Sequence, residues 1–302
     1  TPVKGMYMTE EDQKETAARV KRVLKGINEI APLPAPAHKA VSMIHDPDLD
    51  LDKLGRVLSV DPSFVGMLLK MVNSAFYGMR SKITTVKNAI VVIGLNKLNS
   101  LILAAAVMEK FRTLPPELGN RLWGHAVWTA EWSKELGRAL SFKDEDELFV
   151  AGILHNVGEM VMIQYFRGQY DNLDTLSEVS GESRLDAERK LLGGTHADLG
   201  SYLFSLWQLP SDIVQSTLLH HHDISVLATM KNVSRHAWIV NLAAALAGIS
   251  SDLDDAAFHA ALQKTITPYR TLPLPEISNL KIDRLYEQVA GAVAQIQEIF
   301  KG

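Results

Sequence analysis

The chain has 302 residues, of which 47% are hydrophobic and 22% are charged, and its formal net charge is −4. This balance is typical of a globular protein with a sizeable core, and the length fits one large or two medium domains. A mildly acidic chain argues against DNA binding, because nucleic-acid-binding proteins usually present a basic face. The chain has no cysteine, which excludes disulfides and thiolate metal sites and fits a reducing compartment.

The sequence contains no clear membrane-spanning segment. A spanning helix needs about 20 apolar residues in a row, and the most apolar stretch, Ile90 to Met108, is interrupted by Asn96, Lys97 and Asn99. The first residues do not resemble a signal peptide. We therefore expect a cytoplasmic protein that does not enter a membrane. Because the sequence lacks an initiator Met, it is left open whether it is a fragment of a longer protein.

Helical spacing of apolar residues dominates the chain. Leu95, Leu98 and Ile102 fall on one helical face, and Asp61 before Pro62 marks a capped helix start. We find no convincing alternating strand pattern. In chain order, helices are expected at residues 10–28, 37–44, 51–59, 62–74, 86–93, 96–111, 117–140, 145–166, 173–179, 184–192, 196–207, 211–221, 231–247, 253–265 and 282–300.

Proline-containing stretches at 113–116 and 271–275 divide the chain. We predict an all-α protein with two packed helical lobes, at residues 27–112 and 113–222. Residues 1–26 are expected to form a linker helix, and residues 223–302 to form helices that complete or cap the second lobe. The last helix has an apolar face that docks onto the core or onto a partner; its residues are Leu285, Val289, Val293, Ile296 and Phe300.

Five of the ten histidines lie in or beside apolar helices, where a bundle could bring them together. A single histidine is most often a hydrogen-bonded core or surface side chain, but five such residues favour a shared site. Imidazole is a common metal ligand. The candidate ligands are His125, His155, His196, His220 and His221.

A two-metal hydrolase also needs carboxylates, because a bridging aspartate holds both ions and offsets their charge. The residue that follows His155 is Asn156, whose amide has nearly the same shape as aspartate but carries no charge. An amide bridges cations poorly, so this position argues against hydrolysis.

Several motifs give the chain a resemblance to a known family. It resembles the HDOD family, a regulatory offshoot of the HD-domain metal-dependent phosphohydrolases, over residues 27–222. The first lobe carries the HDOD-type motifs and the second the HD-type motifs. These motifs are Leu33-Pro34, the stretches 45–50, 60–64, 72–78 and 89–95, then Leu154-His155-Asn156-Val157-Gly158, Thr195-His196-Ala197, 207–210 and His220-His221.

The resemblance implies roles for individual positions. The five histidines fall where the enzymes keep metal-binding histidines, whereas Asn156 and Asn241 fall where the enzymes keep aspartates. Both departures replace a carboxylate with an amide, so we expect the hydrolase to be degenerate. The histidines could still hold one divalent transition metal, such as Fe, Mn, Ni or Zn.

Three further residues have two interpretations each. Glu159 lies four residues after His155 and is either a substitute metal ligand or, as we favour, a solvated helix charge. Asn73 and Tyr77 form either a docking surface or, as we favour, an internally bonded turn.

The function implied by the resemblance is a non-enzymatic signal-transduction module that acts through protein–protein contacts. Its expected partners are signalling proteins, including a fused or separate sensor or receiver domain. The alternative is a metal-dependent phosphohydrolase acting on a nucleotide or cyclic dinucleotide; the histidines favour it and Asn156 and Asn241 oppose it. A third interpretation is a module that responds to metal or to pH, because neighbouring imidazoles resist joint protonation.

Overall fold

The structure is a computed structural model that describes residues 35–44, 46, 48–73, 82–111, 114–143, 145–173, 177, 182–207, 209–249, 253–271 and 275–300. Within these residues the secondary structure consists of helices, and no strand is present. The all-α prediction is therefore confirmed. The predicted linker helix within residues 1–26 lies outside the described residues.

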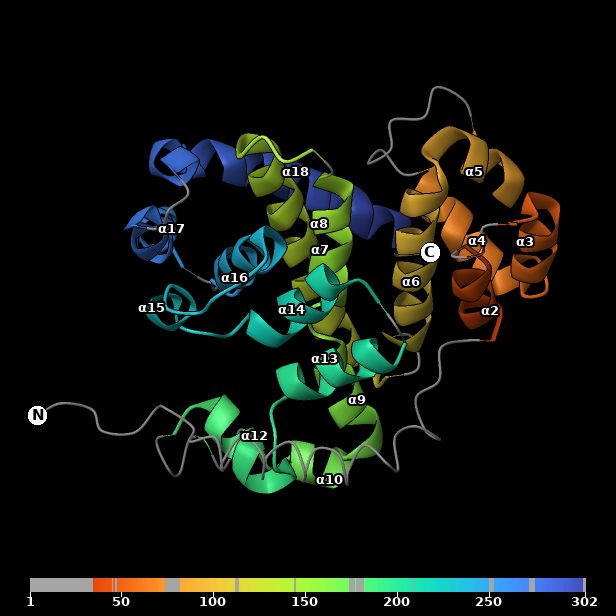
Figure 1. The fold of residues 1–302 in the computed structure, drawn as a ribbon. Helices are drawn as coiled ribbons and strands as arrows, with labels where there is room; N and C mark the ends of the chain where they lie inside the picture. Colours follow the sequence, from red (N-terminus) through yellow and green to blue (C-terminus); the bar gives the residue numbers. More distant parts are fainter. Residues whose placement is uncertain are drawn as a thin grey trace, which may run out of the picture.

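The N-terminal lobe is a group of five helices, seen in orange and gold in Figure 1. Asp61 caps its third helix as expected, since the Asp61 carboxylate accepts a hydrogen bond from the Phe64 backbone N–H at 3.1 Å. Gly94, with φ +81°, ends one helix and allows the next to begin at Leu95. The helices are α2 (Ala35–Ile44), α3 (Leu51–Leu58), α4 (Pro62–Val72), α5 (Val86–Ile93) and α6 (Leu95–Phe111).

The second lobe surrounds α7 and α8, which lie at its centre in Figure 1. It consists of α7 (Pro116–Ala139), α8 (Glu145–Leu154), α9 (Val157–Tyr165), α10 (Arg167–Tyr170), α12 (Arg184–Leu192), α13 (His196–Leu206), α14 (Ser211–Leu219), α15 (Ile224–Leu227), α16 (Arg235–Ala247), α17 (Asp255–Ile266), η2 (Thr267–Thr271), η3 (Pro275–Asn279) and α18 (Ile282–Phe300).

The C-terminal helices are packed into the second lobe. Helix α16 contacts α7, α8 and α14, and α18 lies along α7. The ring of Tyr286 on α18 stacks on Trp128 and Trp132 of α7, with centroid distances of 5.9 and 6.4 Å. Four apolar residues of α18 are buried, so this face docks onto the core: Leu285, Val289, Val293 and Ile296.

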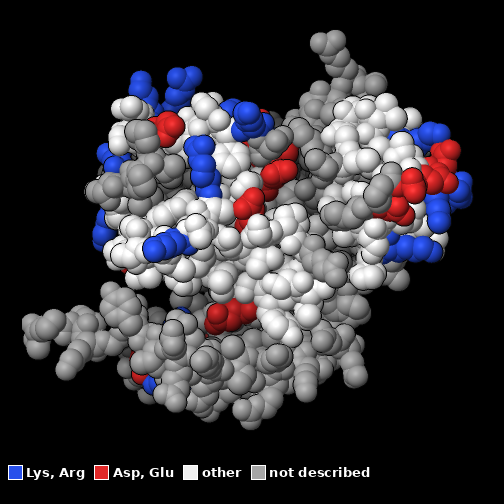
Figure 2. Space-filling model, viewed as in Figure 1, with Lys and Arg blue, Asp and Glu red and all other residues white. Residues whose placement is uncertain are grey.

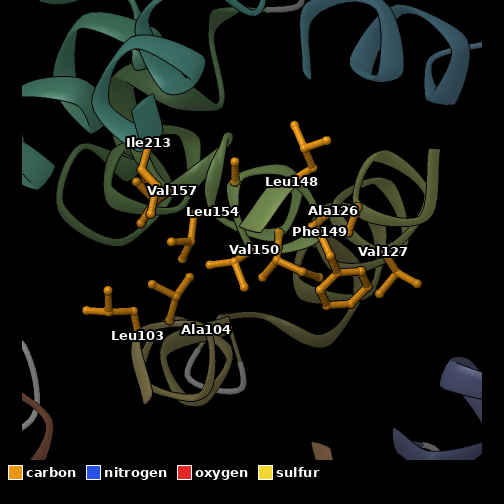
Figure 3. Close-up of a cluster of buried hydrophobic side chains, with 14 of the residues drawn as sticks. Leu103, Ala104, Ala126, Val127, Leu148, Phe149, Val150, Leu154, Val157 and Ile213 are labelled. Carbon is orange, nitrogen blue, oxygen red and sulfur yellow. The ribbon is translucent and has the colours of Figure 1, made fainter. Parts of the chain in front are cut away.

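The two lobes share one apolar core. Figure 3 shows Leu103 and Ala104 of α6 facing Val150 and Leu154 of α8. By length and composition, the stretch Glu145–Tyr165 could cross a membrane, but 89% of its most apolar window is buried inside the protein. It is the central helical segment of the fold.

This central segment is broken where the sequence predicts one continuous helix over 145–166. Asn156 leaves the helical path, with φ −107° and ψ 20°, so α8 ends at Leu154 and α9 begins at Val157. Beyond the break α9 passes very close to α13: a Cβ at Gly158 would lie 1.8 Å from the His196 carbonyl oxygen. Gly158 therefore permits the close approach that brings His155 and His196 into one site.

Candidate functional site

The structure brings all five candidate histidines together, although they come from four parts of the chain. Their rings form a connected cluster, in which neighbouring ring centroids lie between 4.1 Å (His220–His221) and 5.3 Å (His196–His220) apart. The other ring contacts are His125–His155 at 5.1 Å, His155–His220 at 4.8 Å and His196–His221 at 4.9 Å.

The cluster is buried at its centre and open at one side. His155 is 0% exposed, and His196 and His220 are each 3% exposed. His125 on α7 is half-buried, and His221, just after the end of α14, is exposed. The cluster thus reaches the protein surface at His221.

Hydrogen bonds fix which nitrogen of each buried ring carries its proton. In all three rings Nδ1 lies beside an acceptor, so Nδ1–H donates and Nε2 is the unprotonated nitrogen of the neutral ring. The acceptors are the Gly152 carbonyl for His155 (2.6 Å), the Thr217 carbonyl for His220 (2.7 Å) and the Glu188 carboxylate for His196 (2.8 and 2.9 Å).

Two of the Nε2 atoms face each other within hydrogen-bonding distance. Nε2 of His196 and Nε2 of His220 are 3.3 Å apart. Nε2 of His155 is buried and has no hydrogen-bond partner among the described residues. A buried nitrogen without a partner is unfavourable unless something binds it.

Burial and charge set the protonation of the cluster. Burial, together with the neighbouring imidazoles, holds the pKa of His155 and of His220 well below the ordinary value. Burial alone would also lower the pKa of His196, but the Glu188 carboxylate raises it. His155 and His220 are therefore neutral at pH 7 and have a lone pair available on Nε2.

These features fit a transition-metal ion. One ring nitrogen from each of His196, His220 and His221 lies within 4.8 Å of the others. Neutral imidazole nitrogens suit Zn, Ni, Fe and Cu ions, and metal-binding histidines usually donate their other N–H to a carbonyl or a carboxylate. These three histidines could hold an ion, with His155 beside them, and an ion there would supply positive charge and Lewis acidity.

Asn156 sits beside the cluster but its amide donates away from it. Its Nδ2 donates to Glu159 Oε2 at 2.7 Å, while its Oδ1 is buried without a hydrogen-bond partner in the described part of the chain. Asn156 thus offers the cluster only a neutral oxygen.

Asn241 has a different arrangement, because its whole amide is engaged. Nδ2 donates to the Leu219 carbonyl at 2.8 Å and to the His222 carbonyl at 3.0 Å. Oδ1 accepts a hydrogen bond from the Tyr269 hydroxyl at 2.5 Å. Asn241 therefore fixes the turn that carries His220 and His221.

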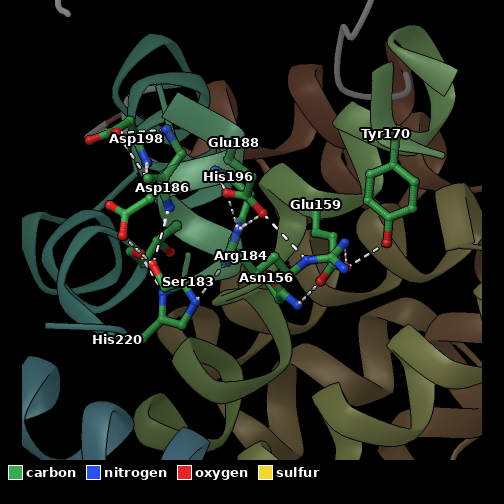
Figure 4. A network of polar contacts seen from close by, with 12 residues as sticks. Asn156, Glu159, Tyr170, Ser183, Arg184, Asp186, Glu188, His196, Asp198 and His220 are labelled. Atoms are coloured by element: carbon green, nitrogen blue, oxygen red, sulfur yellow. Dashed lines mark hydrogen bonds and ion pairs between the residues drawn. The ribbon is translucent and has the colours of Figure 1, made fainter. Parts of the chain in front are cut away.

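Glu159 is not a solvated helix charge, so that favoured interpretation was wrong. It is 5% exposed, because the break before α9 turns it inward. Oε1 accepts hydrogen bonds from three side chains, and Oε2 accepts the one from Asn156 (Figure 4). The three donors to Oε1 are Arg121 at 3.0 Å, Tyr170 at 2.6 Å and Arg184 at 3.1 Å.

These partners determine the charge of Glu159. Burial acts to raise the pKa of Glu159, but the nearby cationic groups and hydrogen bonds outweigh it and lower the pKa to about 2. Glu159 is therefore ionised, and donors already occupy both of its oxygens. It lies close enough to His196 to interact with it electrostatically.

Glu188 is the site residue that the sequence did not reveal. It is 0% exposed, and besides its contact with His196 Nδ1 it accepts a hydrogen bond from the His196 backbone N–H at 2.8 Å. Arg184 Nε lies 3.6 Å from Glu188 Oε1. The sequence signal available for Glu188 was its i, i+4 spacing from Arg184 on α12. A loop separates Glu188 from His196, so this spacing did not reveal their contact.

The remaining candidate residues have structural surroundings. Both amide hydrogens of Asn73 are used internally, by the Leu69 carbonyl at 2.8 Å and the Ile83 carbonyl at 2.7 Å. Tyr77 lies outside the described residues. Asp198 serves the first turn of its helix, where it forms a capping box with Thr195.

Comparison with known proteins identifies the family. Residues 30–223 match the model of the HDOD domain. The chain belongs to the HDOD family. It is also 27% identical over 220 residues to an uncharacterised protein of Treponema pallidum, and that match covers 70% of this chain and 41% of the other protein. The chain thus spans less than half the length of this relative.

Solved structures with the same fold are known from several bacteria. An HDOD domain protein of unknown function from Geobacter sulfurreducens has a TM-score of 0.69 at 20% identity, over 95% of this chain and 99% of that one. A provisionally named phosphohydrolase from Shewanella amazonensis has a TM-score of 0.68 at 22% identity, over 92% and 98%. A provisionally named signal transduction protein from Marinobacter aquaeolei has a TM-score of 0.63 at 19% identity, over 99% and 68%.

Proposed function

We propose that this HDOD protein is a non-enzymatic module that acts in signal transduction through contacts with other proteins. The observation that carries the proposal is the hydrogen bonding of the Asn156 and Asn241 amides. At both positions the amide N–H groups are donors to fixed acceptors inside the protein. The residues that replace the aspartates are thus part of the hydrogen-bonding structure of the lobe.

A carboxylate would be unfavourable at either position. At 156 it would stand where Nδ2 now lies, 2.7 Å from the ionised Glu159, and two carboxylates at that distance repel each other. At 241 it would face the carbonyl oxygens of Leu219 and His222, which carry partial negative charge. This surrounding structure disfavours the two aspartates that a two-metal hydrolase needs.

The N-terminal lobe offers a surface for partners. Val91 and Val92 on α5 are 73% and 51% exposed, and Val60, just beyond α3, is 76% exposed; α3 and α5 pack against each other. On the face shown in Figure 2, neither the basic nor the acidic side chains of the described residues form a continuous band. This suits docking of a signalling protein, such as a fused or separate sensor or receiver domain, better than binding of DNA.

A second function is favoured by the histidine cluster itself: hydrolysis of a phosphoester in a nucleotide or cyclic dinucleotide. The clustered ring nitrogens and the surface exposure of His221 support it. This function would need an ionised carboxylate with a free oxygen beside the cluster. Among the described residues, hydrogen-bond donors occupy both oxygens of Glu159, and Glu188 binds His196.

A measurement of phosphoester hydrolysis distinguishes the two functions. Protein purified without a polyhistidine tag is loaded with Mn, Fe, Ni or Zn and incubated with bis(p-nitrophenyl) phosphate and with cyclic dinucleotides. We expect the same rate as for the free metal ion. A rate above that level that disappears in the matched His155→Ala variant would establish an enzyme and overturn the proposal.

A further inference from the structure

We propose that Glu188 prepares His196 to hold a single late transition-metal ion together with the Nε2 atoms of neighbouring histidines. In this arrangement the Glu188 carboxylate contacts the ligand His196 and does not bind the ion itself. This inference goes beyond the regulatory function, because it concerns what the second lobe binds and holds whether or not the protein hydrolyses anything.

The geometry of Glu188 is specific for one histidine. Its Oε2 accepts a hydrogen bond from the His196 backbone N–H at 2.8 Å, and both of its oxygens lie within 2.9 Å of Nδ1 of the same residue. Glu188 is 0% exposed. A wholly buried carboxylate is unfavourable unless it is closely paired, so its place in the fold depends on His196 and on Arg184, whose Nε lies 3.6 Å away.

The consequence for His196 is a fixed ring orientation. With Nδ1–H held by Glu188, Nε2 points to Nε2 of His220 at 3.3 Å. The unpartnered Nε2 of His155 is a second, independent sign of a missing ligand, since it is 0% exposed and its ring centroid lies 4.8 Å from that of His220. A carboxylate hydrogen-bonded to a ligating imidazole strengthens that imidazole as a ligand.

The donor set also selects the class of ion. The atoms that converge are imidazole nitrogens, whereas the carboxylates of Glu159 and Glu188 are engaged by other donors. Nitrogen ligands favour Co, Ni, Cu and Zn over Mn, while Mg and Ca prefer oxygen ligands. Asn241 is fully engaged and Asn156 offers only a neutral oxygen, so the site has ligands for one ion.

The test is metal binding by the tag-free protein after chelator treatment, followed by Co(II) absorption, by calorimetry with Zn(II) and by elemental analysis. We expect one ion per chain and much weaker binding of Mn(II). Glu188→Gln keeps the shape of the side chain and removes its charge, and it should weaken Zn(II) binding by about 10- to 100-fold. The matched control is Asp186→Asn on the same helix, whose exposed carboxylate pairs with Arg189 at 3.0 Å; its effect should stay within about twofold.

Equal Zn(II) affinity in Glu188→Gln and in the parent protein would overturn the proposal, as would two ions per chain or no binding by the parent. If Glu188→Gln does not fold, X-ray absorption of the Co(II)-loaded parent decides. Imidazole nitrogens with or without water are expected around the ion, and a directly bound carboxylate would refute the assignment. Turnover plays no part in these readouts, so the regulatory proposal and the metal proposal can fail separately.

Discussion

The two lobes use their interiors differently. In the described part of the N-terminal lobe the buried side chains are apolar, whereas the buried polar and charged residues of the structure all lie between Thr129 and Asn241. Burying polar groups is unfavourable unless each finds a partner. The second lobe retains such groups, and five of their atoms, His155 Nε2 and Asn156 Oδ1 among them, have no hydrogen-bond partner among the described residues.

The difference indicates where ligand chemistry can occur. The N-terminal lobe has the interior of a structural element and offers its outer surface, with Val91 and Val92, for contacts. The second lobe holds a cluster of buried histidines, with the amide of Asn156 beside it and the amide of Asn241 next to the turn that carries His220. Substitutions in the two lobes should therefore separate folding stability from ligand binding.

The largest effect is expected in the N-terminal lobe. Phe64 is 0% exposed, and Phe64→Ala should lower the free energy of unfolding by about 3 to 5 kcal/mol, because it leaves a cavity. Metal affinity should not change in the protein that remains folded. Urea unfolding and Zn(II) titration of the same sample check both parts, and a parallel loss of Zn(II) binding would undo the separation between the lobes.

The next effect concerns the amide that fixes the histidine turn. Asn241→Asp should lower the free energy of unfolding by about 3 kcal/mol at pH 7, because a buried charge then faces two carbonyl oxygens. The control is Asn88→Asp on the exposed face of α5, which should change stability by no more than about 0.5 kcal/mol. Similar urea midpoints for the two variants would show that the Asn241 contacts are not essential.

The third effect is dependent on pH. The pKa of Glu159 falls from 4.5 to about 2 in the folded protein, so ionised Glu159 stabilises the fold above pH 4.5 and this contribution is lost as the pH falls toward 2. The contribution amounts to about 3 kcal/mol. Glu159→Gln should therefore be less stable than the parent protein at pH 7 and nearly equal to it at pH 2.5. Urea unfolding at both pH values measures this, and a constant difference would disprove the linkage.

The fourth effect has the opposite dependence on pH. Burial raises the pKa of Glu131 on α7 from 4.5 to about 7, so the folded state binds a proton between these values and loses stability as the pH rises. Glu131→Gln should remove this loss and gain about 3 kcal/mol at pH 8 relative to pH 4.5. Thermal unfolding at the two pH values is the measurement; an unchanged pH profile would mean that Glu131 is already ionised below pH 7.

The sequence predicted the helices and the histidine cluster well, because both depend on local patterns. Helical spacing located α5 over the range that the structure shows, and Asp61 marked the start of α4. The break at Asn156 was missed, because the apolar pattern continues through it and only the approach of α9 to His196 requires it. The short helices α10 and α15 were missed as well, since four residues carry no detectable period.

Polar partners that are distant in sequence were beyond prediction. Glu159 looked like a surface charge, and its donors Arg121 and Arg184 lie 38 and 25 residues away in the sequence. The contact of Asn241 with Leu219 spans 22 residues. Residue types and local spacing identify the ligands of a site, but only the folded structure shows what orients them.

The most direct test of the central claim is the Asn156→Asp variant, measured for stability, metal content and phosphoester turnover in one preparation. We predict a loss of about 3 kcal/mol in the free energy of unfolding, because the new carboxylate faces ionised Glu159, and no turnover above the free metal ion. A variant that remains as stable as the parent protein and hydrolyses bis(p-nitrophenyl) phosphate would contradict the account. It would show that a single substitution separates this protein from an enzyme.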